Sequence, residues 1–214
     1  VQSHRPSRAL RDEPAARCLI TLGALAHPDW GFQVTKFDLA YALVQAIKDL
    51  DLVRAQLLAE IVLRTQDGHQ VMTSFDRIKT DMQERITYYF GEHFETLRIW
   101  LEDYARQPTA ELDYYLRRLF GEVLSVKDFG FHEDFDAGRG VANLIESARK
   151  FRWAAGEFSN ASEEPIGKEY IQMVVEGVVA AQYLQSWDVQ QQEAVFLSPA
   201  YTYLLSNRAV NYQF

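Results

Sequence analysis

The sequence feature that most constrains the fold of this chain is a hydrophobic repeat between residues 75 and 106, a stretch that contains no proline. Apolar side chains recur there every three or four residues, at Ile78, Met82, Ile86, Phe90, Phe94, Leu97 and Leu101. This spacing matches the 3.6-residue period of an α-helix and places these side chains along one face. It predicts one long amphipathic helix, straight or bent near Gly91, that ends before Pro108.

The same period recurs through most of the chain and predicts further helices over residues 12–28, 35–47, 51–65, 109–124, 141–153 and 167–187. The alternation of apolar and polar residues that is typical of strands is confined to residues 194–197 and 209–214. The chain is therefore predicted to be mainly α, a multi-helix domain with one long helix and a short β-containing C-terminal tail.

The change of pattern near residue 188 suggests two parts. Residues 1–188 are expected to form a helical accessory domain, and residues 189–214 a short strand-turn-strand segment at the edge of a following motor-like domain. Residues 125–140 are rich in aromatic residues and glycine and are predicted to form a loop. The chain lacks an initiator methionine and ends within a strand-like run, so we expect it to be a piece of a longer protein.

The net charge of −8, from 30 acidic and 22 basic residues, argues against a module that grips nucleic acid over its whole surface. Such affinity comes mainly from basic side chains that neutralise phosphates. One local exception is Arg139, beside a glycine turn, followed in the next helix by Arg149, Lys150 and Arg152, with only Glu146 opposing them in the sequence. These four are the candidate DNA-binding residues, and they predict weak, salt-sensitive binding. A solvated helix face is the competing interpretation.

The sequence offers no complete catalytic site. It contains neither a GxxxxGK[ST] phosphate loop nor a GxGxxG turn after a strand, and its five histidines do not form a metal-ligand motif such as HExxH. The single cysteine, Cys18, lies in an apolar run and is predicted to be structural. We therefore expect this chain to have no catalytic residue, no metal and no cofactor of its own.

Two observations bear on location and on stacking surfaces. The apolar run after Arg17 falls short of the roughly 20 residues that span a bilayer, so we expect no membrane contact and a cytoplasmic location. The aromatic clusters Tyr88-Tyr89-Phe90 and Tyr114-Tyr115 could present rings to single-stranded bases, but at helical spacing such residues more often belong to the core and its rim.

A family resemblance rests on the two ends of the chain. Residues 6–17, PSRALRDEPAAR, run into the apolar segment CLITLGALA at 18–26. This order resembles the opening of the 2B-like accessory insertion in UvrD/Rep-type superfamily 1 DNA helicases, where a PL…EP.VR run precedes an apolar helix. The tail, AVFLSPA at 194–200 and VNYQF at 210–214, resembles the return of the chain into the second RecA-like motor domain.

The resemblance implies a role within a larger protein. It implies an accessory domain that contacts duplex or single-stranded DNA, or other domains or subunits, and that moves between states to regulate unwinding. ATP and Mg²⁺ would belong to the full-length parent only. Active motors usually carry threonine, histidine, lysine and glycine in the return segment, where this chain has Ser198, Pro199 and Ala200, so the parent is either a working helicase or an inactivated relative.

The alternative function is a helical protein-protein interaction module unrelated to helicases. The acidic charge and the abundant tyrosines fit this alternative equally well. A self-contained enzyme is disfavoured, because the sequence does not offer a nucleophile, a base and an orienting group together.

Overall fold

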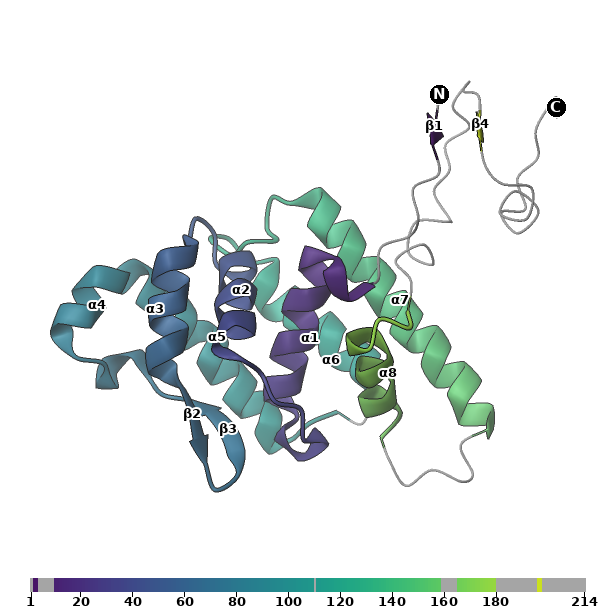
Figure 1. Cartoon of the computed structure of the whole chain (residues 1–214), viewed down its shortest axis with the longest axis horizontal. Helices are drawn as coiled ribbons and strands as arrows, with labels where there is room; N and C mark the ends of the chain where they lie inside the picture. Colours follow the sequence, from purple (N-terminus) through teal and green to yellow (C-terminus); the bar gives the residue numbers. More distant parts are fainter. Residues whose placement is uncertain (1, 4–9, 110, 159–164, 180–195, 198–214) are drawn as a thin grey trace.

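The computed structural model describes residues 2–3, 10–109, 111–158, 165–179 and 196–197, and within them the chain is mainly α, which confirms the predicted fold class (Figure 1). Short 3₁₀ turns and one π turn join the helices. The α-helices are α1 (Pro14–Ala26), α2 (Lys36–Ala46), α3 (Leu52–Val62), α4 (Thr80–Ile86), α5 (Tyr88–Arg106), α6 (Leu112–Leu119), α7 (Phe135–Phe158) and α8 (Ile166–Val175).

Helix α1 is the centre of the body and packs against α2, α5, α6 and α7 (Figure 1). It is nearly apolar all round, with Arg17 as its one charged residue, Pro14 in its first turn and Pro28 just beyond its end. Cys18 is fully buried in it and donates a weak hydrogen bond to the Ala42 carbonyl of α2. Burial raises the pKa of the Cys18 thiol far above its usual range, so this residue is structural, as the sequence predicted.

A buried histidine closes the C-terminal end of α1. His27 stacks on Trp30 at 3.9 Å between ring centroids, and its Nδ1 donates to the Gly23 carbonyl at 2.8 Å. Nε2 therefore accepts from the Tyr104 hydroxyl of α5, 3.1 Å away. Burial lowers the pKa of His27 below its ordinary 6.5, and the hydrogen bond to Gly23 opposes that shift.

Helix α2 begins as predicted, whereas α3 ends earlier than predicted. Thr35 and Asp38 form a reciprocal capping box at the start of α2. The predicted extension of the third helix to residue 65 is wrong. Residues Leu63–Gln66 (β2) and His69–Met72 (β3) form an antiparallel hairpin instead.

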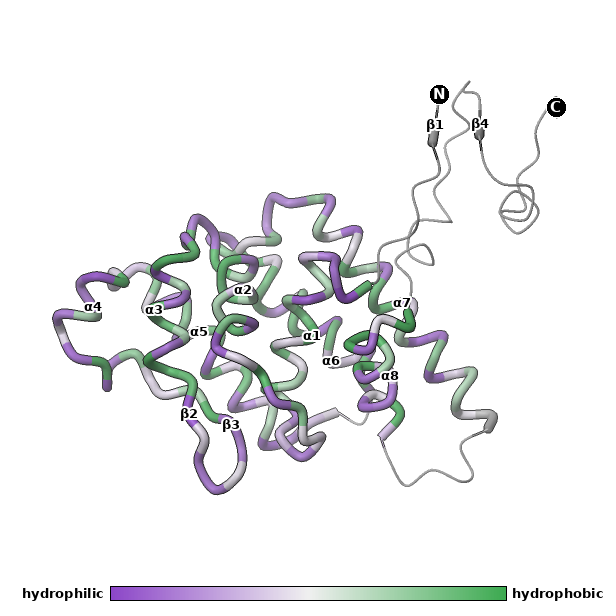
Figure 2. The backbone as a smooth tube through the Cα atoms, in the orientation of Figure 1, coloured by the Kyte–Doolittle hydropathy of each residue, from purple (hydrophilic) through white to green (hydrophobic). Residues whose placement is uncertain are grey.

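The reason lies in the two turn residues of this hairpin. Asp67 and Gly68 both adopt positive φ, 52° and 84°, which is the conformation that a tight two-residue hairpin requires. In the sequence, this Asp-Gly pair was used only to end the helix, although the pair is a strong signal for a β-hairpin turn. The tip of the hairpin is hydrophilic, as Figure 2 shows.

The predicted single helix over residues 75–106 is also wrong, because the chain divides it into the turn Phe75–Arg77, α4 and α5. The break falls at Thr87, which has a φ of 79°, and not at Gly91. Gly91 lies within α5, where an added Cβ would come within 2.3 Å of the Phe75 ring. Gly91 therefore allows close packing of the turn on the helix and does not bend it.

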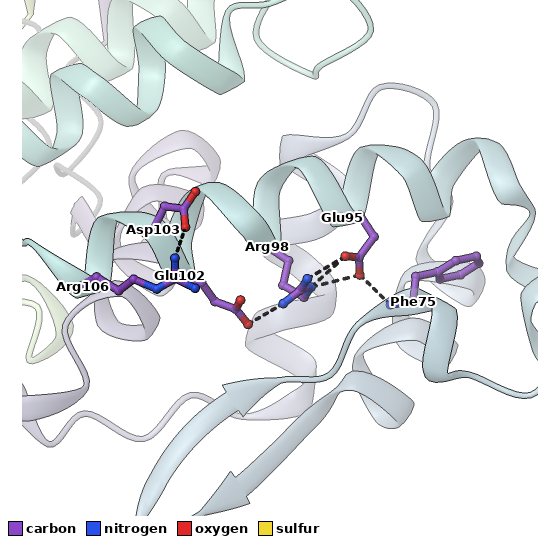
Figure 3. Close-up of polar contacts among 6 residues, drawn as sticks. All are labelled: Phe75, Glu95, Arg98, Glu102, Asp103 and Arg106. Carbon is purple, nitrogen blue, oxygen red and sulfur yellow. Dashed lines mark hydrogen bonds and ion pairs between the residues drawn. The ribbon is translucent and has the colours of Figure 1, made fainter.

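The turn at Phe75 is held to α5 by an ion-paired cluster (Figure 3). Glu95 accepts a hydrogen bond from the Phe75 amide at 2.5 Å and pairs with Arg98 at 2.8 Å. Arg98 also pairs with Glu102 one turn later. Desolvation would raise the pKa of Glu95, but the hydrogen bonds from Arg98 and the Phe75 amide outweigh it, so the net shift is downward.

Helix α7 begins earlier than predicted and is the longest helix that the structure describes, at 24 residues. The predicted loop over 125–140 therefore ends six residues too late. The Asp134 carboxylate caps the helix by accepting from the Ala137 amide at 2.9 Å, so the expected glycine turn around Arg139 is helical. In the described part of the chain, no helix is both long and apolar enough to cross a membrane.

The predicted helix over 167–187 is α8, which ends at Val175, followed by Gly177 at a φ of 80°. Residues 180–187 lie outside the described part of the chain. So do the predicted boundary at 188/189 and the predicted strand at 209–214.

Two short strands that are far apart in the sequence form a parallel pair. Gln2–Ser3 (β1) lies beside Phe196–Leu197 (β4), with Gln2 opposite Phe196 and Ser3 opposite Leu197 (Figure 1). This confirms a strand within the predicted segment 194–197. Its partner, at the N-terminal end, was not predicted.

Candidate nucleic-acid interface

The four predicted DNA-binding residues all lie on α7, but they do not form one patch. Arg139 and Arg149 are ten positions apart, which at a rise of 1.5 Å per residue corresponds to about 15 Å along the helix. Residues advance by about 100° each around a helix, so Lys150 and Arg152 project from nearly opposite sides. The sequence placed Arg149, Lys150 and Arg152 in one helix, as observed, but placed Arg139 in the preceding loop and treated all four residues as one surface.

Each of the four residues has a nearby carboxylate, which corrects the expectation that only Glu146 opposes them. Glu146 itself pairs with Arg149 at 2.5 Å and with Lys150 at 3.6 Å. Arg139 pairs with Asp136 at 2.7 Å, one turn before it. These three pairs are largely exposed, so each contributes little to stability and competes only weakly with a phosphate.

The pair formed by Arg152 and Asp113 is different, because it is largely buried. The Arg152 guanidinium donates to both carboxylate oxygens of Asp113, at 2.9 and 3.1 Å, and Asp113 is only 2% exposed. This hydrogen bonding raises the pKa of Arg152. The two residues are 39 positions apart and meet because α6 packs on α7. Arg152 therefore anchors one helix to the other.

Two exposed aromatic side chains lie beside these arginines. Tyr114 on α6 is 46% exposed and Trp153 on α7 is 58% exposed. The guanidinium carbons of Arg117 and Arg152 each lie 5.7 Å from the centroid of the Tyr114 ring. We call the group formed by these residues and Arg149 the aromatic-arginine surface; its members are Tyr114, Arg117, Arg149, Arg152 and Trp153.

Helical spacing explains part of this surface. Arg149 precedes Trp153 by four residues, and its guanidinium lies 4.9 Å from the Trp153 ring centroid. Trp153, the last residue of the predicted helix 141–153, is exposed. For the Tyr114-Tyr115 pair the prediction of core and rim is confirmed, because Tyr115 is completely buried and Tyr114 lies at the rim.

A cavity of about 560 Å³ opens beside this surface, between α6, α7 and α8. Trp153, Arg152 and Asp113 line it on one side, and Tyr170 of α8 lines it on another. Burial raises the pKa of Tyr170 to about 12. The cavity thus combines apolar and polar walls and has the size of a small-molecule site.

Acidic residues at the start of α7 have other partners. Glu133 pairs with Lys48 at 2.5 Å, Asp134 caps the helix and Asp136 pairs with Arg139. Among the described residues, no group of three or more histidine, cysteine, aspartate or glutamate side chains is placed to hold a metal ion.

No protein-family model, no curated protein and no solved structure matches this chain.

Proposed function

We propose that this chain is a DNA-contacting accessory domain of a superfamily 1 helicase-like repair protein. The observation that carries the proposal is the parallel pairing of β1 with β4. Parallel neighbours need a long crossover connection and belong almost entirely to α/β sheets. A helical body between two such strands has the topology of an insertion into an α/β domain, which is the arrangement that the resemblance implies.

In this role the body contacts DNA and the parent supplies the motor. Helix α7 offers Arg139, Arg149 and Lys150 on its exposed sides, where each pairs with an exposed carboxylate and can exchange it for a phosphate. ATP and Mg²⁺ would be bound by the parent, and the protein would work in the cytoplasm. The other domains or subunits of the parent are the natural protein partners.

The DNA contact can be tested on the whole chain by fluorescence anisotropy with a labelled duplex at about 50 mM salt. The test variant is Arg139→Ala/Arg149→Ala/Lys150→Ala, which leaves the Arg152 anchor to Asp113 intact. We expect affinity to fall about tenfold and the salt dependence to weaken by two to three units, about one for each lost phosphate contact.

A matched control separates a local contact from a general effect of charge. The variant Arg64→Ala/Arg85→Ala/Arg106→Ala removes three exposed arginines from β2, α4 and α5 and gives the same net charge. It should bind almost like the unmodified chain. Equal weakening by both triple variants, or no binding by the unmodified chain, would contradict the proposal and favour the protein-interaction module.

A further inference from the structure

The aromatic-arginine surface has features that phosphate contact alone does not use. Two large rings on neighbouring helices, Tyr114 and Trp153, are each about half exposed, and guanidinium groups lie within 6 Å of both. Singly exposed aromatic residues are common on protein surfaces and need no explanation. Here Arg152 lies against the Tyr114 ring and directly precedes Trp153, whose ring Arg149 contacts, so arginines link the two rings beside the cavity, as on surfaces where bases stack.

The charges of this region favour ligand groups that are neutral. Arg149 and Arg152 already pair with Glu146 and Asp113, and the whole chain carries a net charge of −8. Binding through phosphates alone would therefore be weak. Nucleobases, in contrast, are uncharged and present flat faces to aromatic rings and guanidinium planes.

From this arrangement we infer that the aromatic-arginine surface binds single-stranded DNA, with bases stacked on Tyr114 and Trp153. Duplex DNA cannot use these rings, because each of its base faces is covered by the next base pair. The cavity bordered by Trp153 and Arg152 is large enough to receive a base that leaves the stack at this point.

One arginine is available to hold the strand on this platform. In the described part of the chain Arg117 has no carboxylate within ion-pair distance, while it lies against Tyr114. It can therefore contact a backbone phosphate while the neighbouring base stacks on the ring. The inference rests on the proposed function and deepens it, since it names the form of DNA that this face recognises.

The test compares three labelled probes of about 20 units on the whole chain by fluorescence anisotropy: oligo(dT), an abasic strand with the same phosphates, and a duplex. We expect oligo(dT) to bind about tenfold more tightly than the abasic strand, because only the bases can stack. Equal affinity for these two strands would overturn the inference.

Substitutions then locate the stacking. Trp153→Ala and Tyr114→Ala should each weaken oligo(dT) binding about tenfold, with little change for the duplex. Trp153→Phe keeps a ring and should stay within about threefold of the unmodified chain. Tyr88→Ala removes a ring from α5 that is 58% exposed, and it should leave binding unchanged. Thermal melting of every variant checks that the fold is kept.

The outcomes separate this inference from the proposed function. Duplex binding that depends on Arg139, Arg149 and Lys150, with oligo(dT) binding indifferent to Trp153 and Tyr114, would overturn the inference and leave the proposed function standing. Failure to bind any probe would overturn both. A loss of oligo(dT) binding in Tyr88→Ala equal to that in Trp153→Ala would also overturn the inference.

Discussion

Arg152 owes its position to Asp113, a carboxylate 39 residues away in the sequence. A residue chosen from the sequence as a DNA contact is therefore also a structural anchor, and its removal would leave a buried carboxylate without its cation. Losing one partner of a buried pair is costly, whereas losing an exposed pair such as Arg149 with Glu146 changes little. DNA-binding tests that remove Arg152 would confuse a loss of affinity with a loss of fold.

His27 gives a prediction about pH. Its pKa in the folded chain lies below the ordinary value of 6.5, so the unfolded chain binds more protons as the pH falls through 6.5. Its contribution to stability is therefore present above pH 6.5 and is lost toward lower pH, by about 1.4 kcal/mol for each unit of pKa depression. Urea denaturation at pH 7.5 and 5.5 should show a lower unfolding free energy at the lower pH.

The matching variants are His27→Phe, which keeps a ring against Trp30, and His69→Gln, which changes an exposed histidine of β3. Between pH 7.5 and 5.5, the unfolding free energy of His27→Phe should fall less than that of the unmodified chain. His69→Gln should follow the unmodified chain. The same pH dependence in all three proteins would show that His27 does not carry the effect.

Among the elements, the break between α4 and α5 predicts that substitutions at Thr87 and at Gly91 change the stability of the chain in opposite directions. Thr87 has a branched side chain at a φ of 79°, a backbone conformation that glycine adopts without strain. Thr87→Gly should therefore stabilise the chain by about 1 kcal/mol, and Thr87→Ala should not. Gly91→Ala should destabilise it by about 2 kcal/mol, because the new methyl group would clash with the Phe75 ring.

Chemical denaturation of these three variants checks the prediction. If Gly91→Ala were neutral and Thr87→Gly destabilising, the break would lie at Gly91, as the hydrophobic repeat suggested.

The elements also show how far the sequence could predict the fold. The ends of α1 and the start of α2 follow local signals, namely Pro14, Pro28 and Thr35, and the predicted helices 12–28 and 35–47 lie within two residues of the observed bounds. The hairpin was missed although Asp67-Gly68 is a strong local signal for it. The break at Thr87 carries no such signal, because nothing in a threonine indicates positive φ.

For the candidate interface, the sequence predicted part of the helix, residues 141–153, but neither its first turns, which carry Arg139, nor the surface. Arg139, Arg149, Lys150 and Arg152 could be grouped because they are close in sequence. Their carboxylate partners include Asp113, which only the packing of α6 on α7 brings near. The contact between Arg152 and Tyr114 arises from the same packing, so no sequence pattern could have identified it.

On the scale of the whole molecule, the proposed division of labour predicts the absence of nucleotide binding. The sequence has no phosphate loop, so we expect the chain not to bind or hydrolyse Mg-ATP measurably. Isothermal titration calorimetry should give no dissociation constant below about 100 µM, which corresponds to roughly −5.5 kcal/mol. A tighter constant would mean that the chain holds a nucleotide site of its own.

The parallel pairing of β1 with β4 also bears on how such a body could be gained or exchanged. A crossover of about a dozen residues, often a single helix, is long enough to connect two neighbouring parallel strands. The roughly 190 residues between Ser3 and Phe196 occupy the place of that one connection. In the proposed role, the helical body could therefore be enlarged, trimmed or replaced during evolution without changing the order of strands in the sheet that would hold it.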